Sequence, residues 1–250
     1  MALAALTLTQ YIELVKKYMT EDPTDLTNPM FTDAWITTVL NAGQRDVVIS
    51  LNNDAFKTTA TIDAPVGAVA LSATTSAGVA APVTDFLSHM EVLFTPSGGT
   101  TYRLSDITEQ YLDQTQPNWR QSNNTSTTPA GIIINPNLGG ITLRTFPTLS
   151  AAVTNGWFLR YAKIPTDMSA GTDVSGLTGL LPQLWHLEEF LLPSYCLLRM
   201  YMFNGGTQDD QAQKWAQIYG DQKMELRKAL NCLHVGNTSY AYGIWTGRRL

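Results

Sequence analysis

The longest hydrophobic pattern lies between Pro182 and Leu233 and predicts two long helices joined by a tight turn. In the first helix, apolar residues recur at steps of three and four and so share one face: Leu184, Leu187, Leu191, Tyr195, Leu198 and Met202. The second helix carries a facing stripe: Ala212, Trp215, Tyr219, Leu226, Leu230 and Leu233. Asn204-Gly205-Gly206 is typical of a helix end, and Thr207 with Asp210 resembles a capping box. Pro193 predicts a kink or the true start of the first helix.

Two shorter helices are predicted near the N-terminus. Thr7 and Gln10 form a capping box for the first, whose apolar residues keep helical spacing: Leu8, Tyr11, Ile12, Val15 and Met19. Thr32 is the expected N-cap of the second helix, with Phe31 and Ile36 placed to form a hydrophobic staple. Its expected buried face is Trp35, Ile36, Val39, Leu40, Val47 and Leu51, and Asn52-Asn53-Asp54 ends it.

Between Lys57 and Pro165 the hydrophobic period changes from 3.6 towards 2, which is typical of β-strands. The expected strands are Lys57–Ile62, Val66–Ser72, His89–Thr95, Thr101–Leu104, Ile132–Asn135, Ile141–Thr145 and Trp157–Ile164. Pro96-Ser97-Gly98-Gly99 predicts one hairpin, and Asn137-Leu138-Gly139-Gly140 predicts another.

The remaining segments complete the expected architecture. Ser105–Thr108 predicts the start of a short helix that carries Tyr111 and Leu112. Gln121–Pro129 is rich in Asn, Ser and Thr, which favours a mobile loop or projecting arm, and Thr166–Gly179 predicts a polar linker. We expect an α+β fold, with a helical bundle of two N-terminal and two C-terminal helices (1–54 and 166–233), a large β-rich insertion (55–165) and an extended C-terminal tail (234–250).

Composition and charge narrow the function classes. Of the 250 residues, 44% are hydrophobic, which is enough for a substantial core. Only 15% are charged, against about 25% in a typical soluble domain, so we expect copies or partners to bury part of the surface. Sixteen basic and 21 acidic residues give a net charge of −5. This balance argues against wrapping DNA, but it permits a surface that DNA passes.

Neither a membrane span nor secretion is expected, because the sequence has no apolar run of about 18 residues and no basic, apolar leader. Cys196 and Cys232 are expected to be buried free thiols, which fits a cytosolic origin.

Enzymatic chemistry is not expected. The histidines are His89, His186 and His234, and the stretch after His186 lacks the second His of a zinc-binding helix. Neither a phosphate-binding loop nor a nucleophile elbow occurs in the sequence. Asp106, Glu109 and Asp113 could align carboxylates on one helical face, for which a solvated face is the favoured interpretation. We therefore assign no catalytic residue, metal site or cofactor.

The last seventeen residues differ from the rest of the chain. They combine aromatic and basic side chains with glycines and contain no acidic residue: Tyr240, Tyr242, Trp245, Arg248 and Arg249 are the candidates for binding a partner. Aromatic residues and Arg dominate interface hot spots, which favours docking over a disordered terminus.

Several motifs together resemble the head-to-tail adaptor (connector) proteins of tailed bacteriophages. Phe31-Thr32-Asp33-Ala34-Trp35-Ile36, followed by Leu40-Asn41-Ala42, is similar to the second helix of that family. Three segments are similar to its insertion: Tyr102-Arg103-Leu104 with Ile107-Thr108 and Pro117, Ile141-Thr142-Leu143 with Pro147, and Leu159-Arg160-Tyr161 with Pro165. Asp209, Ala212, Trp215 and Tyr219 are similar to its final helix.

The resemblance implies a structural virion protein located at the head–tail interface and made in the host cytoplasm. Such proteins form twelvefold rings beneath the portal, prolong the DNA channel and provide a platform for tail attachment. The implied partners are other copies of the chain, the portal protein, a tail tube or nozzle protein, and genomic DNA that passes without sequence-specific binding. The tail of the chain would then contact the portal, and the β insertion would contact the tail or neighbouring copies.

Three alternatives stay open. One is a carbohydrate- or ligand-binding β module on a helical stalk, in which Tyr102, Trp119 and Trp157 stack on sugars, although aromatic residues in a β-rich segment more often belong to the core. Another is an enzyme of unknown class, which a cleft with strongly perturbed carboxylates would indicate. The last is another tail structural protein without portal contact.

Truncation after Leu233 tests the assignment of the tail. The truncated chain should fold, because the predicted helices end before the cut, and it should fail to bind the portal protein. Circular dichroism and co-sedimentation with portal measure the two outcomes. Binding equal to that of the full chain would refute the assignment.

Overall fold

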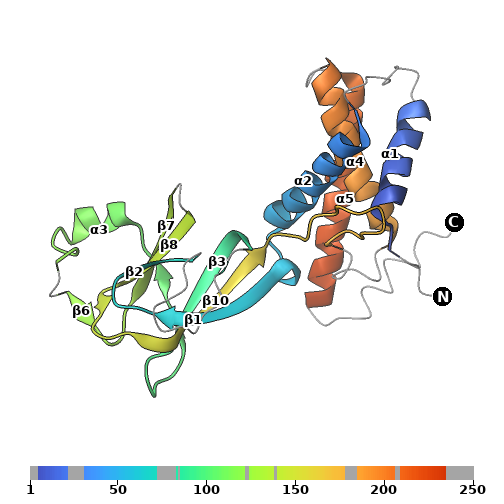
Figure 1. The fold of residues 1–250 in the computed structure, drawn as a ribbon. Helices are drawn as coiled ribbons and strands as arrows, with labels where there is room; N and C mark the ends of the chain where they lie inside the picture. Colours follow the sequence, from blue (N-terminus) through green and yellow to red (C-terminus); the bar gives the residue numbers. More distant parts are fainter. Residues whose placement is uncertain are drawn as a thin grey trace. The chain divides into compact units, whose positions relative to one another are not determined.

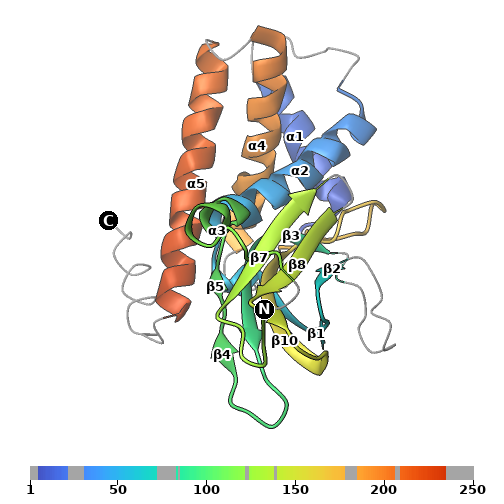
Figure 2. The same ribbon diagram turned by 90° about the vertical axis from the view of Figure 1, so that its left-hand side faces the viewer.

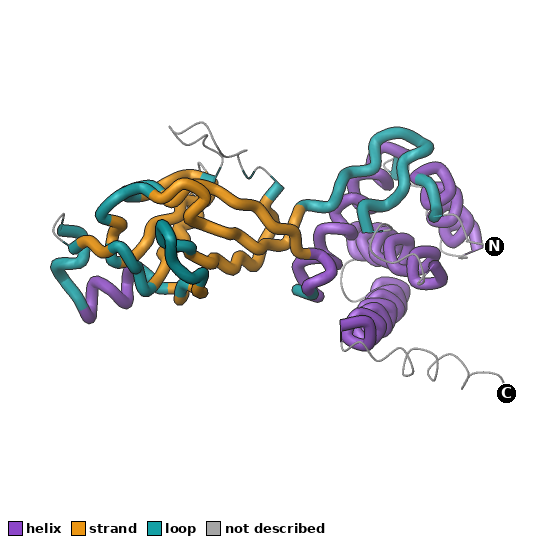
Figure 3. The backbone as a smooth tube through the Cα atoms, turned by 90° about the horizontal axis from the view of Figure 1, so that it is seen from below, coloured by secondary structure: helices purple, strands orange, loops and turns teal. Residues whose placement is uncertain are grey.

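The computed structural model describes residues 5–21, 31–71, 83, 85–121, 124–137, 140–177, 185–205 and 209–234. The fold is α+β, as predicted, and helices and strands segregate along the chain (Figure 1, Figure 3). The chain divides into two compact units, which we name the helical unit (Met1–Phe56 with Ile164–Leu250) and the β unit (Lys57–Lys163).

The helical unit contains four helices: α1 (Leu8–Glu21), α2 (Asp33–Leu51), α4 (Trp185–Gly205) and α5 (Asp210–His234). α1, α2 and α5 all contact α4, and α4 and α5 lie side by side (Figure 2). Because it has neighbours on several sides, α4 is buried over most of its circumference, through Leu187, Leu191, Leu192, Cys196, Leu197, Met200 and Tyr201. The prediction of a single stripe was therefore too narrow. Pro193 lies inside α4, so it does not mark the helix start.

Local capping signals operate largely as the sequence predicts. The Thr7 backbone N–H donates to Gln10 Oε1 (2.8 Å), which closes the first capping box. Thr32 Oγ1 accepts from the Trp35 N–H, and α2 ends where Asn52 adopts a left-handed conformation. At α5, Thr207 lies outside the described residues, and Asp209 accepts from the N–H groups of the first turn.

The β unit is built from two four-stranded sheets. The first sheet has the order β1 (Lys57–Ala64), β10 (Val153–Lys163), β3 (Phe86–Phe94), β4 (Tyr102–Arg103). The second sheet has the order β2 (Ala68–Ala70), β8 (Gly140–Phe146), β7 (Gly131–Asn137), β5 (Ser105–Asp106). The predicted hairpins β3–β4 and β7–β8 pair antiparallel, whereas β5 pairs with β7 in parallel.

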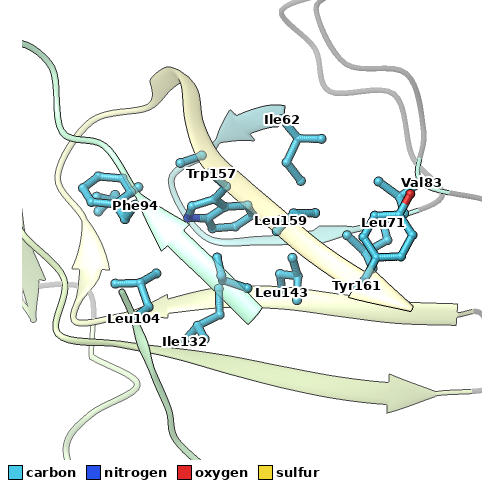
Figure 4. Packing of buried hydrophobic residues seen from close by; sticks show 13 residues of the cluster. Ile62, Leu71, Val83, Phe94, Leu104, Ile132, Leu143, Trp157, Leu159 and Tyr161 are labelled. Atoms are coloured by element: carbon cyan, nitrogen blue, oxygen red, sulfur yellow. The ribbon is translucent and has the colours of Figure 1, made fainter. Parts of the chain in front are cut away.

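The two sheets share one hydrophobic core (Figure 4). Trp157 and Leu159 of β10, Phe94 of β3, Leu143 of β8 and Ile132 of β7 all lie in it, and each is almost fully buried. The neighbouring Ile133 points to the opposite face of the second sheet, because side chains alternate along a strand. There it packs with Leu112 of the short helix α3 (Glu109–Thr115) and with Trp119 and Phe146.

Two predictions in the β unit were wrong. Ser105 and Asp106 form β5 and not the start of a helix, and α3 begins after its N-cap Thr108. The segment Gln121–Pro129 was predicted to be a mobile loop or arm, yet it contains strand β6 (Thr125–Ser126), which pairs with β9 (Thr148–Leu149). Tyr102 also donates its hydroxyl to the Pro129 carbonyl (3.0 Å). These contacts join residues distant in sequence, so local composition does not reveal them.

Two glycines test the packing of the helices. A Cβ added at Gly43 of α2 would lie 2.9 Å from Cδ1 of Tyr195 on α4, whereas nothing lies within 4 Å of a Cβ added at Gly220 of α5. We expect Gly43→Ala to destabilise the protein by about 1–2 kcal/mol, because overpacking exceeds the gain in helix propensity. Gly220→Ala should stabilise it by about 0.5–1 kcal/mol. Urea unfolding of both variants measures the difference, and equal effects of the two changes would contradict this packing.

Candidate functional site

The sequence-predicted partner-binding residues Tyr240, Tyr242, Trp245, Arg248 and Arg249 lie outside the described residues. The side chains of His89, His186 and His234 are also outside the described part. Among the side chains that the structure describes, no group of three or more His, Cys, Asp or Glu residues is placed to hold a metal ion. Across the described helices, none combines the length and apolar character needed to cross a membrane.

The three predicted carboxylates are divided between two elements, and Arg120 pairs with two of them. Asp106 lies in β5, while Glu109 and Asp113 lie on α3. Arg120 donates to Asp113 and also lies 3.3 Å from Glu109 Oε2, and Asn135 donates to Glu109 Oε1 (2.7 Å). The hydrogen bonds from Arg120 and then Trp119 hold the pKa of Asp113 below its usual range. Glu109 and Asp113 therefore form an ion-pair cluster with Arg120.

Trp119 holds the turn after α3 against the second sheet. Its side chain is 2% exposed, and Nε1 donates to Asp113 Oδ1 (2.8 Å). The guanidinium carbons of Arg120 and Arg144 lie 4.3 and 5.1 Å from the ring centroid, within the range of cation–π contacts. Trp119 therefore has a structural role, which is to stabilise the turn after α3.

The other two aromatic residues considered for sugar stacking are also engaged in the fold. Trp157 is fully buried in the core between the sheets. The Tyr102 ring packs edge-on against Phe94, and its hydroxyl bonds to a backbone carbonyl. Neither Trp119 nor Trp157 presents a ring face to a ligand, so the core interpretation applies to both.

A pocket of about 330 Å³ lies at the turn that follows α3. Its lining is mostly carboxamide: Gln116, Pro117, Asn118, Trp119, Gln121 and Asn124. None of these side chains titrates near neutral pH, so the pocket has no group for acid–base catalysis.

In the helical unit, a buried polar network fastens the chain where it returns from the β unit. Gln44 is fully buried, and its Oε1 accepts from the Gly176 N–H (2.7 Å) and the Ser175 hydroxyl (3.1 Å). Gln44 Nε2 donates to Asn41 Oδ1 (2.8 Å), which also accepts from the Met168 N–H (2.9 Å). Segment 164–177, predicted only as a polar linker, is thus an integral part of this unit.

Sequence reasoning missed this network, although a signal was present. Asn41 and Gln44 fall among the apolar positions of α2, and an amide placed there needs a buried partner. The sequence does not identify that partner, because the hydrogen bonds join residues more than a hundred positions apart in the chain.

A second polar contact links α2 and α5. The Tyr219 hydroxyl donates to Asp46 Oδ2 (2.5 Å), and Lys223 Nζ lies 3.1 Å from the same oxygen. The Tyr195 ring of α4 packs 5.2 Å from the Tyr219 ring. Burial, with the bond to Asp46, raises the pKa of Tyr219 well above its usual value. The hydroxyl therefore stays protonated at neutral pH and acts as a donor and not as a base. Cys196, in the same unit, is buried, which raises the pKa of its thiol and makes it unreactive.

Comparison with known proteins found no family model and no curated protein that matches this chain. The polar clusters described above are closed by partners within the chain, which is the behaviour of contacts that hold a scaffold. The features of this chain that remain as candidates for a function are therefore its surfaces and the distribution of its charges.

Replacement of Gln44 tests the return network. Gln44→Leu keeps the size of the side chain but leaves the Gly176 N–H and the Ser175 hydroxyl without their acceptor. We expect a loss of about 2–4 kcal/mol in the free energy of unfolding, because both donors are desolvated. Gln217→Leu on the exposed side of α5 is the matched control and should change stability by less than about 0.5 kcal/mol. Similar urea midpoints for the two variants would show that the network does not stabilise the fold.

Proposed function

We propose that this protein is a structural virion component, a head-to-tail adaptor that forms a ring beneath the portal, extends the DNA channel and provides a platform for tail attachment. In this proposal the four helices form the bundle that carries the β insertion, and the C-terminal extension contacts the portal. The resemblance of residues 31–42 and 209–219 to adaptor helices supports the proposal, as does the α+β architecture with helices drawn from both ends of the chain.

The distribution of charge is the observation that carries the proposal. The β unit holds six basic and six acidic residues and so has no net charge: Lys57, Arg103, Arg120, Arg144, Arg160 and Lys163 against Asp63, Asp85, Glu91, Asp106, Glu109 and Asp113. The other ten basic and 15 acidic residues belong to the helical unit, which therefore has the entire net charge of −5. An acidic unit does not gain affinity for DNA by counterion release, so DNA can pass it without being held.

The charges of the β unit are largely paired within the unit. Glu91 lies 3.3 Å from Arg103 and 3.9 Å from Arg160, and Lys163 lies 3.4 Å from Asp85. Contact with another protein therefore desolvates few unpaired charges, and unpaired buried charges are what opposes association most strongly. This suits the β unit to contacts with neighbouring copies or with a tail tube or nozzle protein.

The proposed partners are thus other copies of the chain in a ring of about twelve, the portal, a tail protein and passing genomic DNA. The contact with the portal is assigned to Tyr240, Tyr242, Trp245, Arg248 and Arg249, and the place of action is the virion. No catalytic step and no cofactor enters this function.

Electron microscopy of the purified protein, alone and mixed with portal protein, tests the proposal. We expect closed rings, formed alone or on the portal, with a central opening wide enough for duplex DNA. The chain truncated after Leu233 serves as the control, because it keeps the β unit and all of the described helices except His234, the last residue of α5. Rings that never join the portal would indicate a tail protein of another kind, and a monomer that ignores the portal would refute the proposal.

A further inference from the structure

The pocket at the turn after α3 has a lining that suits recognition of a ligand. Its volume of about 330 Å³ lies at the lower end of the range of about 300–1,000 Å³ that ligand pockets span. Four of its six lining residues carry a carboxamide: Gln116, Asn118, Gln121 and Asn124. Pro117 and Trp119 complete the lining and supply its apolar part. A pocket of this size suits a small ligand or one end of a larger one.

The backbone of the lining is largely committed to hydrogen bonds within the fold. Four bonds of 2.7–3.1 Å join N–H donors of the lining to carbonyls earlier in the chain: Gln116 to Leu112, Trp119 to Gln116, Gln121 to Asn118 and Asn124 to Gln121. The lining is thus a series of tight turns, and not the extended strand edge to which a peptide adds by main-chain hydrogen bonds. Recognition of a ligand therefore falls to the carboxamide side chains.

These carboxamides are accessible to a ligand. Gln116, Asn118 and Gln121 are exposed, and Asn124 is half-buried. Among the described residues, none of the four side chains has a hydrogen-bond partner. Each carboxamide presents an acceptor oxygen and an NH₂ group with two donors. The pocket therefore offers several paired donors and acceptors without any formal charge.

The charges around the pocket disfavour an ionic ligand. None of the six lining residues is acidic or basic. The neighbouring Arg120 is paired with Asp113 and lies 3.3 Å from Glu109 Oε2, so an anion would compete with two carboxylates for it. An ion that lost water in this pocket would gain no opposite charge in return. The ligand that fits is neutral and rich in groups that both donate and accept hydrogen bonds.

We propose that this pocket binds a neutral sugar unit through its hydroxyl groups. A hydroxyl both donates and accepts, so two neighbouring hydroxyls of a sugar match the C=O and NH₂ groups of one carboxamide. The Pro117 ring offers apolar surface to the C–H groups of the sugar. Recognition here does not depend on stacking against an aromatic ring, because Trp119 is only 2% exposed.

Contacts within the β unit hold the lining in place. Trp119 Nε1 donates to Asp113 Oδ1 (2.8 Å), and the Trp119 ring packs edge-on against the Phe146 ring with centroids 6.3 Å apart. At the other end of the turn, the Asn124 carbonyl accepts from the Thr148 N–H of β9 (3.2 Å). Because these contacts fix the lining in the free protein, binding costs little conformational entropy. Every lining residue belongs to the β unit of one chain, so sugar binding does not depend on the proposed ring.

Saturation-transfer NMR of the full chain tests the inference with a panel of uncharged sugars: glucose, galactose, mannose, N-acetylglucosamine and N-acetylgalactosamine. We expect at least one of them to bind. The double variant Asn118→Ala/Gln121→Ala should weaken that binding at least about tenfold, and each single variant should show part of the loss, because each removes hydrogen bonds to the sugar. Gln114→Ala, an exposed carboxamide of α3 outside the lining, is the matched control and should leave binding unchanged.

The variants should keep the fold, because Asn118 and Gln121 are exposed and neither adopts a positive φ. Circular dichroism checks this. Sulfate and a tetra-alanine peptide with blocked ends serve as the anionic and peptide probes. The inference would be overturned by a panel in which no sugar binds at up to about 10 mM, by sugar binding that the double variant leaves unchanged, or by tighter binding of sulfate or the peptide. None of these results bears on the proposed ring, which electron microscopy tests separately.

Discussion

The helical unit depends on one constraint, which is that α4 must be covered on several sides. Its sequence is apolar over most of the circumference, so the helix is stable in water only when α1, α2 and α5 pack against it. α1 and α2 precede the β unit in the chain, and α4 and α5 follow it. The helical unit is therefore complete only with chain segments from both sides of the β unit.

That return explains why polar residues occupy the core face of α2. Segment 164–177 crosses the helical unit as irregular backbone, and buried irregular backbone needs hydrogen-bond partners. Asn41 and Gln44 supply them, while the Asp173 carbonyl accepts from the Leu8 N–H and the Gly171 carbonyl from the Thr9 N–H. The same segment thus binds α1 and α2 through specific hydrogen bonds and not through apolar contact alone.

In the β unit, the two sheets are completed differently. The second sheet is covered by the first sheet on one face and by α3 and Trp119 on the other, so its strand β7 contains three consecutive isoleucines. The first sheet shares the core on one face, and its strand order places β1 and β4 at its two edges. Apolar burial among the described strands is thus satisfied within the β unit.

The sequence by itself determined the elements whose energy is local. The capping box of Thr7 and Gln10, the N-cap Thr32, the end of α2 at Asn52 and the hairpin at residues 96–99 follow from neighbouring residues, and the α+β class follows from the change of hydrophobic period. Only the tertiary structure decided the partners of Asn41 and Gln44, the parallel pairs β5–β7 and β6–β9, and the pairing of Arg120 with the α3 carboxylates. Most of these contacts join residues far apart in the chain. The entropy of closing the intervening loops is recovered only when the whole core assembles, so no short stretch of sequence encodes them.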